Sequence, residues 1–600
     1  MARHANRGTL VAFAAIAIAW AGCAELFGVE PKELLVPTSS SSASGGGSGG
    51  SDGGSSTLSS TAGPGGSGGA GGQGGDGGGI PCFDDDEDGV TDCDGDCDDD
   101  DPDNYPGNDE ICGDLEDNDC DMEADEEEFC QGLGTFVSSQ FGDDSFEGTL
   151  GKPVKTISQG IANALIIGND VDVYVAQGTY AEAVTMEQGV SVLGGHKCAA
   201  IGMCDFERDP EVYVSTIENT TATGVVAPST VTRITTLDGF TIEGLDGANG
   251  DTSAVRLAGG SPVISNNNIF AGDVDTGCNC STAGIRILTI STTKGPLIEN
   301  NRIEGGSAPL ESAGIKVGSD QLGSAEVIGN RILGGDALTS WGVTWYGSDA
   351  EVVILRNNVV DAGDCAAGGS AHGIGVGGGT FTIEKNLINT NAPPTCTGGN
   401  GWSSGLTVFG STTTVQNNVI FGTPADMSAA ILVQQVELAF GDVVINSNTM
   451  QAVAEGASAT TGAAVVVGST AIGDVDVGRL RNNILMGGNA TTAHGILEDE
   501  SANIGRLVVA NNNSISDVDT VYRKWDGGSS TDVVTVMLFN AESIATLNIP
   551  DDCAVAGDYH IPIDSPCIDA GTLDDAPLDD FDGETRPQGA AVDIGADEAG

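Results

Sequence analysis

Pro296-Leu297-Ile298-Glu299-Asn300-Asn301-Arg302-Ile303 is a short apolar run that ends in a pair of asparagines, and Ala325-Glu326-Val327-Ile328-Gly329-Asn330-Arg331-Ile332 repeats its form about thirty residues later. Each stretch places Asn before a variable residue and then an aliphatic one. Self-similarity at this period is typical of chains whose successive coils stack on one another. The repeated stretch therefore predicts one coil of a solenoid.

The Asn-x-aliphatic pattern recurs along the second half of the chain. It occurs at Asn267, Asn301, Asn330, Asn357, Asn386, Asn417, Asn448, Asn482 and Asn513. A tight turn between strands favours a residue that tolerates left-handed backbone angles, as Asn does. Its amide then reaches the Asn one coil away, about 4.8 Å along the axis. We expect a column of stacked asparagines.

A second column lies between these asparagines, where a small residue precedes alternating apolar positions. It comprises Gly284, Gly314, Gly342, Gly373, Gly405, Ala430, Ala464 and Gly495. Because the two columns run in step, each coil contains at least two strands. Stacked Asn rows of this kind resemble those of right-handed parallel β-helices of the pectate-lyase type. The resemblance covers 144–600 and implies an all-β solenoid.

Both ends of this region carry features expected of such a β-helix. Val154, Ile157, Ile161 and Leu165 have helical spacing, which predicts an amphipathic N-terminal cap helix. The alternating run from Val171 to Val175 predicts a first strand. The region 565–598, here called the closing segment, resembles the end of secreted bacterial β-helix proteins. We expect it to cap the open C-terminal coil, whose bare strand edges otherwise invite aggregation.

The N-terminus has the form of an export signal. Arg3 and Arg7 precede the apolar run 10–19, which is too short to span a bilayer as a stable helix. The following 20–23 resembles a bacterial lipoprotein box, which implies a signal peptide at 1–22 and a lipid on Cys23. Ala24 then implies sorting to the outer membrane. The alternative is ordinary cleavage after Ala21, which would release a secreted protein.

Residues 23–80 are mostly Ser and Gly and are expected to form a disordered tether. The next segment, 81–131, is acidic and rich in cysteine. Its carboxylates at alternate positions, with a Gly at the sixth, have the ligand spacing of a calcium loop. The segment resembles an Asp/Cys-rich metal-binding module of myxobacterial surface proteins. The expected structural calcium ligands are Asp84, Asp86, Asp88, Asp92, Asp117, Asp119 and Asp121.

Zinc is the alternative metal, because Cys and Asp both ligate it. The fifteen cysteines become an even set once Cys23 carries a lipid, which favours disulfides in an exported protein. The module contributes six cysteines. In the β-helix region the expected pairs are Cys198 with Cys204, Cys365 with Cys396 and Cys553 with Cys567. The partners of Cys278 and Cys280 stay open.

Three basic residues occupy the same outward position on successive coils of the second column. Arg256, Arg286 and Lys316 form this basic row, and Tyr346 lies near the equivalent position on the next coil, with Trp341 close by. An aromatic ring beside cations suits a sugar or a uronate. The alternative is that these are ordinary exposed side chains paired with acids. The histidines show no ligand spacing.

Two functions follow from these features. The first is a surface lipoprotein with a calcium module and a β-helix that binds polysaccharide or another surface partner without catalysis. The second is a polysaccharide lyase with Arg286 or Lys316 as its base. The formal net charge of -65 argues against nucleic acid as a partner. Fold alone does not establish an enzyme.

Overall fold

The computed structural model describes residues 134–533 and 560–599 except for gaps at 169–170, 200–203, 205–206, 275–276, 291–293, 319–322, 390–395, 397–401, 436–441, 455–456, 470–474, 499–504 and 526–529. Residues 90, 97, 104–106, 108, 120 and 553 are described as well. The chain divides into two compact units, Met1–Pro106 and Gly107–Gly600. Most of the described residues belong to the second.

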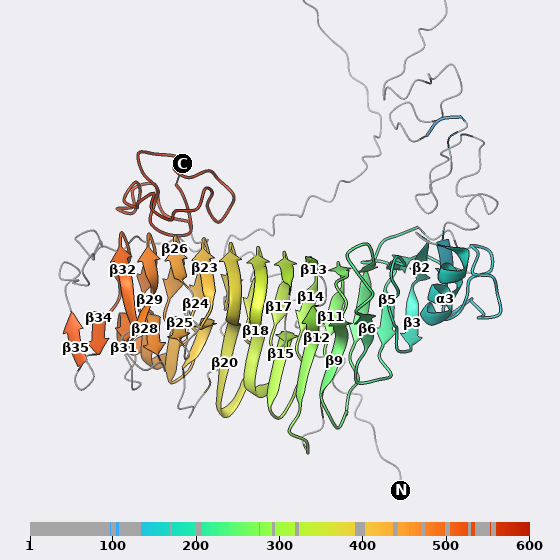
Figure 1. Ribbon diagram of the computed structural model, residues 1–600, viewed down its shortest axis with the longest axis horizontal. Coiled ribbons are helices and arrows are strands. Elements are labelled where there is room, and N and C mark those ends of the chain that lie inside the picture. The colour runs from blue at the N-terminus through green and yellow to red at the C-terminus, as the bar shows by residue number, and fades with distance from the viewer. Residues whose placement is uncertain are drawn as a thin grey trace, which may run out of the picture. The chain divides into compact units, whose positions relative to one another are not determined.

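The second unit is a parallel β-helix whose coils present three faces (Figure 1). A typical coil runs through a strand of face 1, a strand of face 2, an Asn turn and a short strand of face 3. With one exception at the last coil, the strand pairs within the stack are parallel, and equivalent strands pair on successive coils. The solenoid fold expected from the repeats is confirmed.

Face 1 consists of β6 (Val225–Pro228), β9 (Thr252–Gly259), β12 (Ser281–Ile290), β15 (Glu311–Val317), β18 (Ala337–Arg356), β20 (Cys365–Glu384), β22 (Ser403–Phe409), β25 (Met427–Gln435), β28 (Ala459–Ser469), β31 (Ala490–Glu498), β34 (Thr520–Trp525) and β35 (Ser530–Val533). β35 pairs with β34 in antiparallel orientation.

Face 2 consists of β1 (Gly134–Val137), β2 (Asp172–Ala176), β4 (Val192–His196), β7 (Thr236–Asp238), β10 (Val263–Ser265), β13 (Lys294–Glu299), β16 (Ser324–Ile328), β23 (Thr412–Gln416), β26 (Val443–Asn446), β29 (Val475–Arg481) and β32 (Gly505–Asn511). The long strands β18 and β20 continue from face 1 into face 2, which joins the two faces into one sheet.

Face 3 is a separate sheet of β3 (Gly178–Ala181), β5 (Ser215–Glu218), β8 (Phe240–Glu243), β11 (Asn268–Phe270), β14 (Arg302–Glu304), β17 (Arg331–Leu333), β19 (Val359–Asp361), β21 (Leu387–Ile388), β24 (Val419–Phe421), β27 (Thr449–Gln451), β30 (Ile484–Met486) and β33 (Ser514–Ser516).

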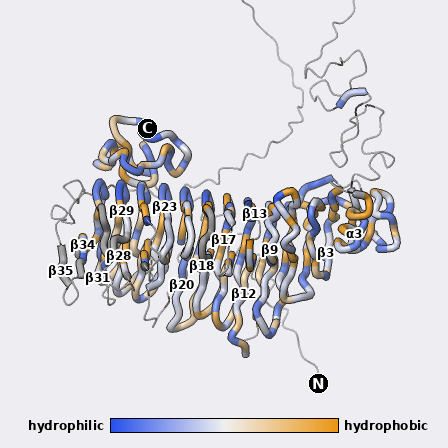
Figure 2. The backbone as a smooth tube through the Cα atoms, in the orientation of Figure 1, coloured by the Kyte–Doolittle hydropathy of each residue, from blue (hydrophilic) through white to orange (hydrophobic). Residues whose placement is uncertain are grey.

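The core runs continuously through the stack because aliphatic residues recur at the same inward positions. Ile285, Ile315 and Val343 lie in register on successive coils, and each is fully buried. Hydrophobic and hydrophilic stretches alternate along the coils (Figure 2). The small residues of the second column sit where faces 1 and 3 converge. A Cβ on Gly314 would lie 2.4 Å from Ile332 Cγ2, so a larger residue would displace that strand.

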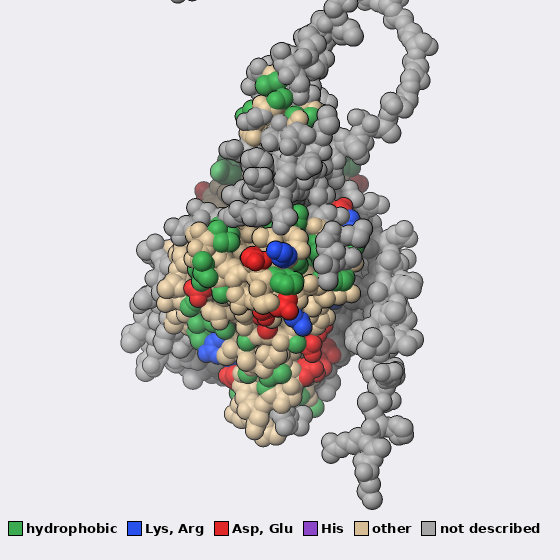
Figure 3. Space-filling model, turned by 90° about the vertical axis from the view of Figure 1, so that its right-hand side faces the viewer, with side chains coloured by type: hydrophobic (Ala, Val, Ile, Leu, Met, Phe, Trp, Pro, Cys, Tyr) green, Lys and Arg blue, Asp and Glu red, His purple; other side chains and the backbone are tan. Residues whose placement is uncertain are grey.

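The N-terminal end carries the expected cap helix, α3 (Ile157–Ile167), which begins at the N-cap Thr156. Ile157 and Ile161 are buried against the first coil. The β-helix starts earlier than Asp144, because β1 already pairs in parallel with β2. Viewed from this end, the described surface is largely uncharged, with few acidic and basic side chains (Figure 3). The described residues contain no helix with the length and apolarity that a membrane crossing requires.

The Asn ladder is present, but three of its predicted members are wrong by one residue. Each side chain donates Nδ2 to the Oδ1 of the next Asn, as in the 3.0 Å bond from Asn267 to Asn301. The members are Asn267, Asn301, Asn330, Asn358, Asn386, Asn418, Asn448, Asn483 and Asn513. Asn358, Asn418 and Asn483 therefore replace the predicted Asn357, Asn417 and Asn482.

The correction has a physical cause. Each turn uses two adjacent residues, of which the first takes the left-handed backbone and the second supplies the stacked amide. The left-handed residues are Asn266, Asn300, Gly329, Asn357, Lys385, Asn417, Ser447, Asn482 and Asn512. Where both positions are Asn, the sequence does not say which amide points inward.

The closing segment does not sit on the last coil, where we expected a cap. It lies along the side of the stack, against the left-handed turn residues (Figure 1). Asn512 donates to the carbonyl of Ala570 at 2.8 Å, and Asn417 donates to that of Asp579 at 2.6 Å. Lys385 forms an ion pair with Asp579 at 2.8 Å. The segment thus runs back over several coils and binds them together.

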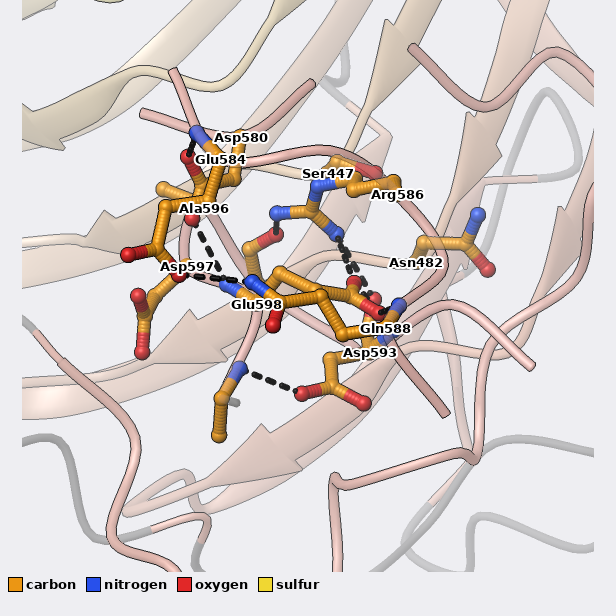
Figure 4. A network of polar contacts seen from close by, with 12 residues as sticks. Ser447, Asn482, Asp580, Glu584, Arg586, Gln588, Asp593, Ala596, Asp597 and Glu598 are labelled. Carbon is orange, nitrogen blue, oxygen red and sulfur yellow. Dashed lines mark hydrogen bonds and ion pairs between the residues drawn. The ribbon is translucent and has the colours of Figure 1, made fainter. Parts of the chain in front are cut away.

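A buried ion pair organises the closing segment (Figure 4). The Arg586 guanidinium lies 3.2 Å from a Glu598 carboxylate oxygen, and both side chains are fully buried. Arg586 also donates to the carbonyls of Asp593 and Gly595. The buried Asp580 accepts the backbone N–H groups of Glu584 and Glu598. Such a pair is costly to break, because either partner alone is a buried unpaired charge.

The three cysteine pairs predicted for the β-helix region are confirmed as disulfides, with Cα–Cα distances of 4.0 Å, 5.7 Å and 5.7 Å in chain order. Cys278 and Cys280, whose partners the sequence left open, bond to each other. In the acidic module, Cys97 and Cys120 each take part in a disulfide. The expected calcium ligands and Cys23 lie outside the described residues.

The two turn positions make a matched test of the ladder. Asn358 is buried and links Asn330 to Asn386, whereas the adjacent Asn357 is exposed and left-handed. We expect Asn358→Ala to lower the free energy of unfolding by about 1–3 kcal/mol, because it leaves buried polar groups without partners. Asn357→Gly should change the free energy of unfolding by only a few tenths of that loss, because Gly adopts the same left-handed backbone freely. Chemical denaturation followed by circular dichroism measures both, and equal losses would contradict the assignment.

Candidate functional site

The basic row lies on the outer surface of face 1 as the sequence predicts. Arg286 is in register with Arg256 on one side and with Lys316 on the other, and Lys316 is in register with Thr344. Both chain neighbours of each basic residue point into the core. The three side chains therefore project from consecutive coils along one line.

Two of the three cations are already paired. Arg286 Nη1 lies 3.1 Å from Asp251 Oδ2, and the same guanidinium donates to Ser281 Oγ at 3.0 Å. Lys316 forms an ion pair with Glu311. Burial lowers the pKa of the Arg286 guanidinium, and the Asp251 carboxylate opposes that shift. Arg256 forms no ion pair within the described part of the chain, so it remains available to an external anion.

An aromatic patch continues the row onto the next three coils. It comprises Trp341, Tyr346, His372 and Phe409. The Trp341 ring stacks on the His372 imidazole at 4.3 Å between centroids and meets the edge of Tyr346 at 6.1 Å. Tyr346 and Phe409 are 5.4 Å apart. Trp341 is only 7% exposed, so Tyr346 and Phe409 present the accessible ring surface.

Two glycines in β20 make room for these rings. A Cβ on Gly375 would lie 2.4 Å from Trp341 Cζ3, and one on Gly377 would lie 2.9 Å from Tyr346 Cδ1. Gly377 stands in register between Tyr346 and Phe409, which lets their rings meet across an intervening coil. Side chains at these positions would push the rings off the sheet. The absence of side chains at Gly375 and Gly377 therefore determines where the rings of the patch lie.

Burial tunes the titratable groups of the patch. It lowers the pKa of His372 to about 3, so the imidazole is neutral at physiological pH. The ring is held by Ser404 Oγ at 2.9 Å from Nδ1 and by Ser370 Oγ at 3.2 Å from Nε2. Burial, with the nearby Glu311 carboxylate, raises the pKa of Tyr346, so its phenol stays protonated. The patch itself is uncharged.

Sequence reasoning found part of this site. It predicted the basic row, Tyr346 and Trp341, and the structure brings them together on one face. It missed His372 and Phe409, because their contacts depend on the register between β18, β20 and β22. It also found no ligand spacing for the histidines, yet His560 lies beside Asp582 and Asp597.

No protein-family model and no curated protein sequence matches the chain. Among solved structures it is similar to pectate lyase Pel9A, with 13% identity and a TM-score of 0.34 over 78% of this chain and 96% of that one. It is similar also to the A-module of the Azotobacter vinelandii mannuronan C-5 epimerase AlgE6, with 15% identity and a TM-score of 0.34 over 64% and 96%. A rhamnogalacturonan lyase matches with 14% identity and a TM-score of 0.20 over 72% and 94%. These likenesses concern the β-helix fold alone.

The neutral state of His372 sets a pH dependence of stability. In the unfolded chain a histidine takes up its proton near pH 6.5, whereas folded His372 resists protonation down to about 3. The unfolded state therefore binds more protons as the pH falls below about 6.5, and stability declines with a slope of up to about 1.4 kcal/mol per pH unit. His372→Phe should flatten that slope between pH 6.5 and 4, measured by denaturation at several pH values. Parallel slopes for both proteins would contradict a buried neutral imidazole.

Proposed function

We propose that the β-helix binds a polysaccharide along face 1, at the aromatic patch and the basic row, without catalysing its cleavage. The observation that carries this proposal is the adjacency of the half-buried rings of Tyr346 and Phe409 to a line of cations. Aromatic faces stack against the apolar faces of sugar rings, and a guanidinium binds a carboxylate through two N–H groups.

The charge arrangement supports binding over catalysis. Arg286 and Lys316 each already hold a carboxylate, so neither is free to accept a proton from a substrate. Arg256 is the cation that remains open to a uronate or another anionic group of the ligand. The stack repeats about every 4.8 Å, so an extended chain lying along the row meets similar groups at a regular interval.

For the rest of the chain we propose a surface lipoprotein. Cys23 would carry the lipid that anchors it to the outer membrane, and the tether and the acidic module would follow. The regular carboxylates of 81–131 support structural calcium in that module. A secreted, unlipidated form is the alternative, and another surface protein is the alternative partner.

A polysaccharide lyase is the second candidate, because burial lowers the pKa of Arg286 and so favours its use as a base. Asp251 and Glu311, whose charges both act on Arg286, would have to release the guanidinium when substrate and calcium bind. That requirement makes the lyase the less favoured function.

The binding proposal predicts specific losses of affinity. Polygalacturonate and alginate are suitable probes in isothermal titration calorimetry with the purified full-length protein. Tyr346→Ala and Phe409→Ala should each weaken binding about tenfold, equivalent to about 1.4 kcal/mol, because each removes one stacking surface. Phe146→Ala, which changes an exposed aromatic residue outside the patch, is the matched control.

The same samples separate binding from cleavage. The unsaturated products of a lyase absorb in the ultraviolet. We expect no steady increase in this absorbance when polyuronate and calcium are added to the protein. Sustained turnover that is lost in Arg286→Ala and Lys316→Ala would overturn the non-catalytic assignment in favour of the lyase. Unchanged affinity in both aromatic variants would remove the patch as the binding surface.

The calcium proposal predicts a metal-dependent module. Full-length protein treated with a chelator should bind calcium with a Kd of about 10⁻⁴–10⁻³ M, the range of extracellular modules. The triple change Asp84→Asn, Asp86→Asn and Asp88→Asn should abolish the binding of at least one calcium ion per protein. Asp564→Asn, an exposed carboxylate outside the module, should not. A triple variant that binds as much calcium as the parent would refute these ligands.

A further inference from the structure

A histidine and two carboxylates from distant parts of the C-terminal region meet beside the buried ion pair of the closing segment. His560 Nε2 lies 2.9 Å from Asp582 Oδ2 and 4.0 Å from Asp597 Oδ1. One ligand atom from each residue lies within 4.8 Å of the other two. Within the described residues this is the one group of three that has a metal-binding arrangement.

The carboxylate of Asp597 is held so that one oxygen faces the histidine. Its Oδ2 accepts the backbone N–H of Ile561 at 2.8 Å, which leaves Oδ1 directed at His560. Figure 4 shows Asp597 beside Glu598 and Asp580 in the closing segment. Asp597 is buried, whereas His560 and Asp582 are exposed. Hydrogen bonds of this kind orient the ligands of metal sites.

Negative charge exceeds positive charge at this point. The carboxylates of Asp580 and Asp582 repel that of Asp597, whose charged form is favoured by the backbone N–H of Ile561 and by His560. The nearby Arg586 is one positive charge shared among several carboxylates, because its guanidinium pairs with Glu598 and also interacts with Asp580, Asp593 and Asp597. A cation at the oxygen of Asp597 that faces His560 would relieve this repulsion.

We propose that His560, Asp582 and Asp597 form a zinc site. Tetrahedral zinc with N and O ligands at about 2.0–2.1 Å separates those ligands by roughly 3.3–3.5 Å. The two measured separations from Nε2 lie on either side of that value, so small side-chain movements complete the geometry. The imidazole favours zinc over calcium, which takes oxygen ligands. The exposed side of His560 and Asp582 leaves the fourth position to water.

The site ties together three parts of the chain. His560 precedes the closing segment, Asp582 lies in its middle and Asp597 lies at its end. A bound zinc ion would fasten the segment to itself at the point where it covers the Asn turns, and it would reinforce the pair formed by Arg586 and Glu598. The site belongs to the closing segment, and it is independent of the polysaccharide surface on face 1.

The test uses the full-length protein, freed of metal and supplied with excess calcium so that the acidic module is occupied. We expect zinc to bind in calorimetry with a micromolar or lower Kd and to raise the Tm. His560→Ala and Asp582→Asn change exposed side chains and should fold. In each variant the affinity of this site for zinc should fall at least about 100-fold, so that one bound zinc ion per protein is lost in the titration. The zinc-dependent rise in Tm should be lost as well. Asp564→Asn should behave like the parent.

Cobalt supplies a second readout, since its visible absorption reports nitrogen and oxygen ligation. The parent should show a band that His560→Ala lacks. The proposal is overturned if both variants retain the parent's zinc stoichiometry and Tm shift. It is overturned also if the parent binds no zinc at micromolar concentration.

Discussion

The amide-to-amide contact from coil to coil is the constraint on which the rest of this molecule depends. Each ladder Asn donates both its side-chain amide and its backbone N–H to the Oδ1 of the next, at distances near 3.0 Å. Because these groups are buried, a coil that slipped by one residue would leave them all without partners. The ladder thereby fixes the register of face 1, and with it the alignment of Arg256, Arg286 and Lys316.

The long strands β18 and β20 show how register becomes a surface. They run without a break from face 1 into face 2, and they carry Trp341, Tyr346 and His372 in their first halves. Gly375 and Gly377 have no side chains, which leaves room for the rings of Trp341 and Tyr346 on the neighbouring strand. An uncharged aromatic patch therefore adjoins a charged row on one continuous sheet. Such a surface can contact an apolar ring face and an anionic group of the same ligand.

Most of the fold could be predicted from the sequence, because each coil of a solenoid repeats the same pattern of residues. The Asn pattern, the second column and three disulfides are local or periodic signals, and the structure bears them out. Asn357 against Asn358 was not decidable, since either amide fits the pattern and backbone angle selects between them. The positions of Phe409 and His560 were equally hidden. Both depend on contacts between residues far apart in the chain, which carry no periodic signature.

The lateral course of the closing segment has a consequence for how the stack matures. Its contacts reach from Asn512 back to Lys385, so residues synthesised last bind turns that were synthesised much earlier. Coils can stack in order as the chain emerges. The side-chain amides of their left-handed turn residues can bond to the closing segment only when that segment has been made. The segment can therefore bind along its full length only after those coils have stacked, and once bound it covers their turns.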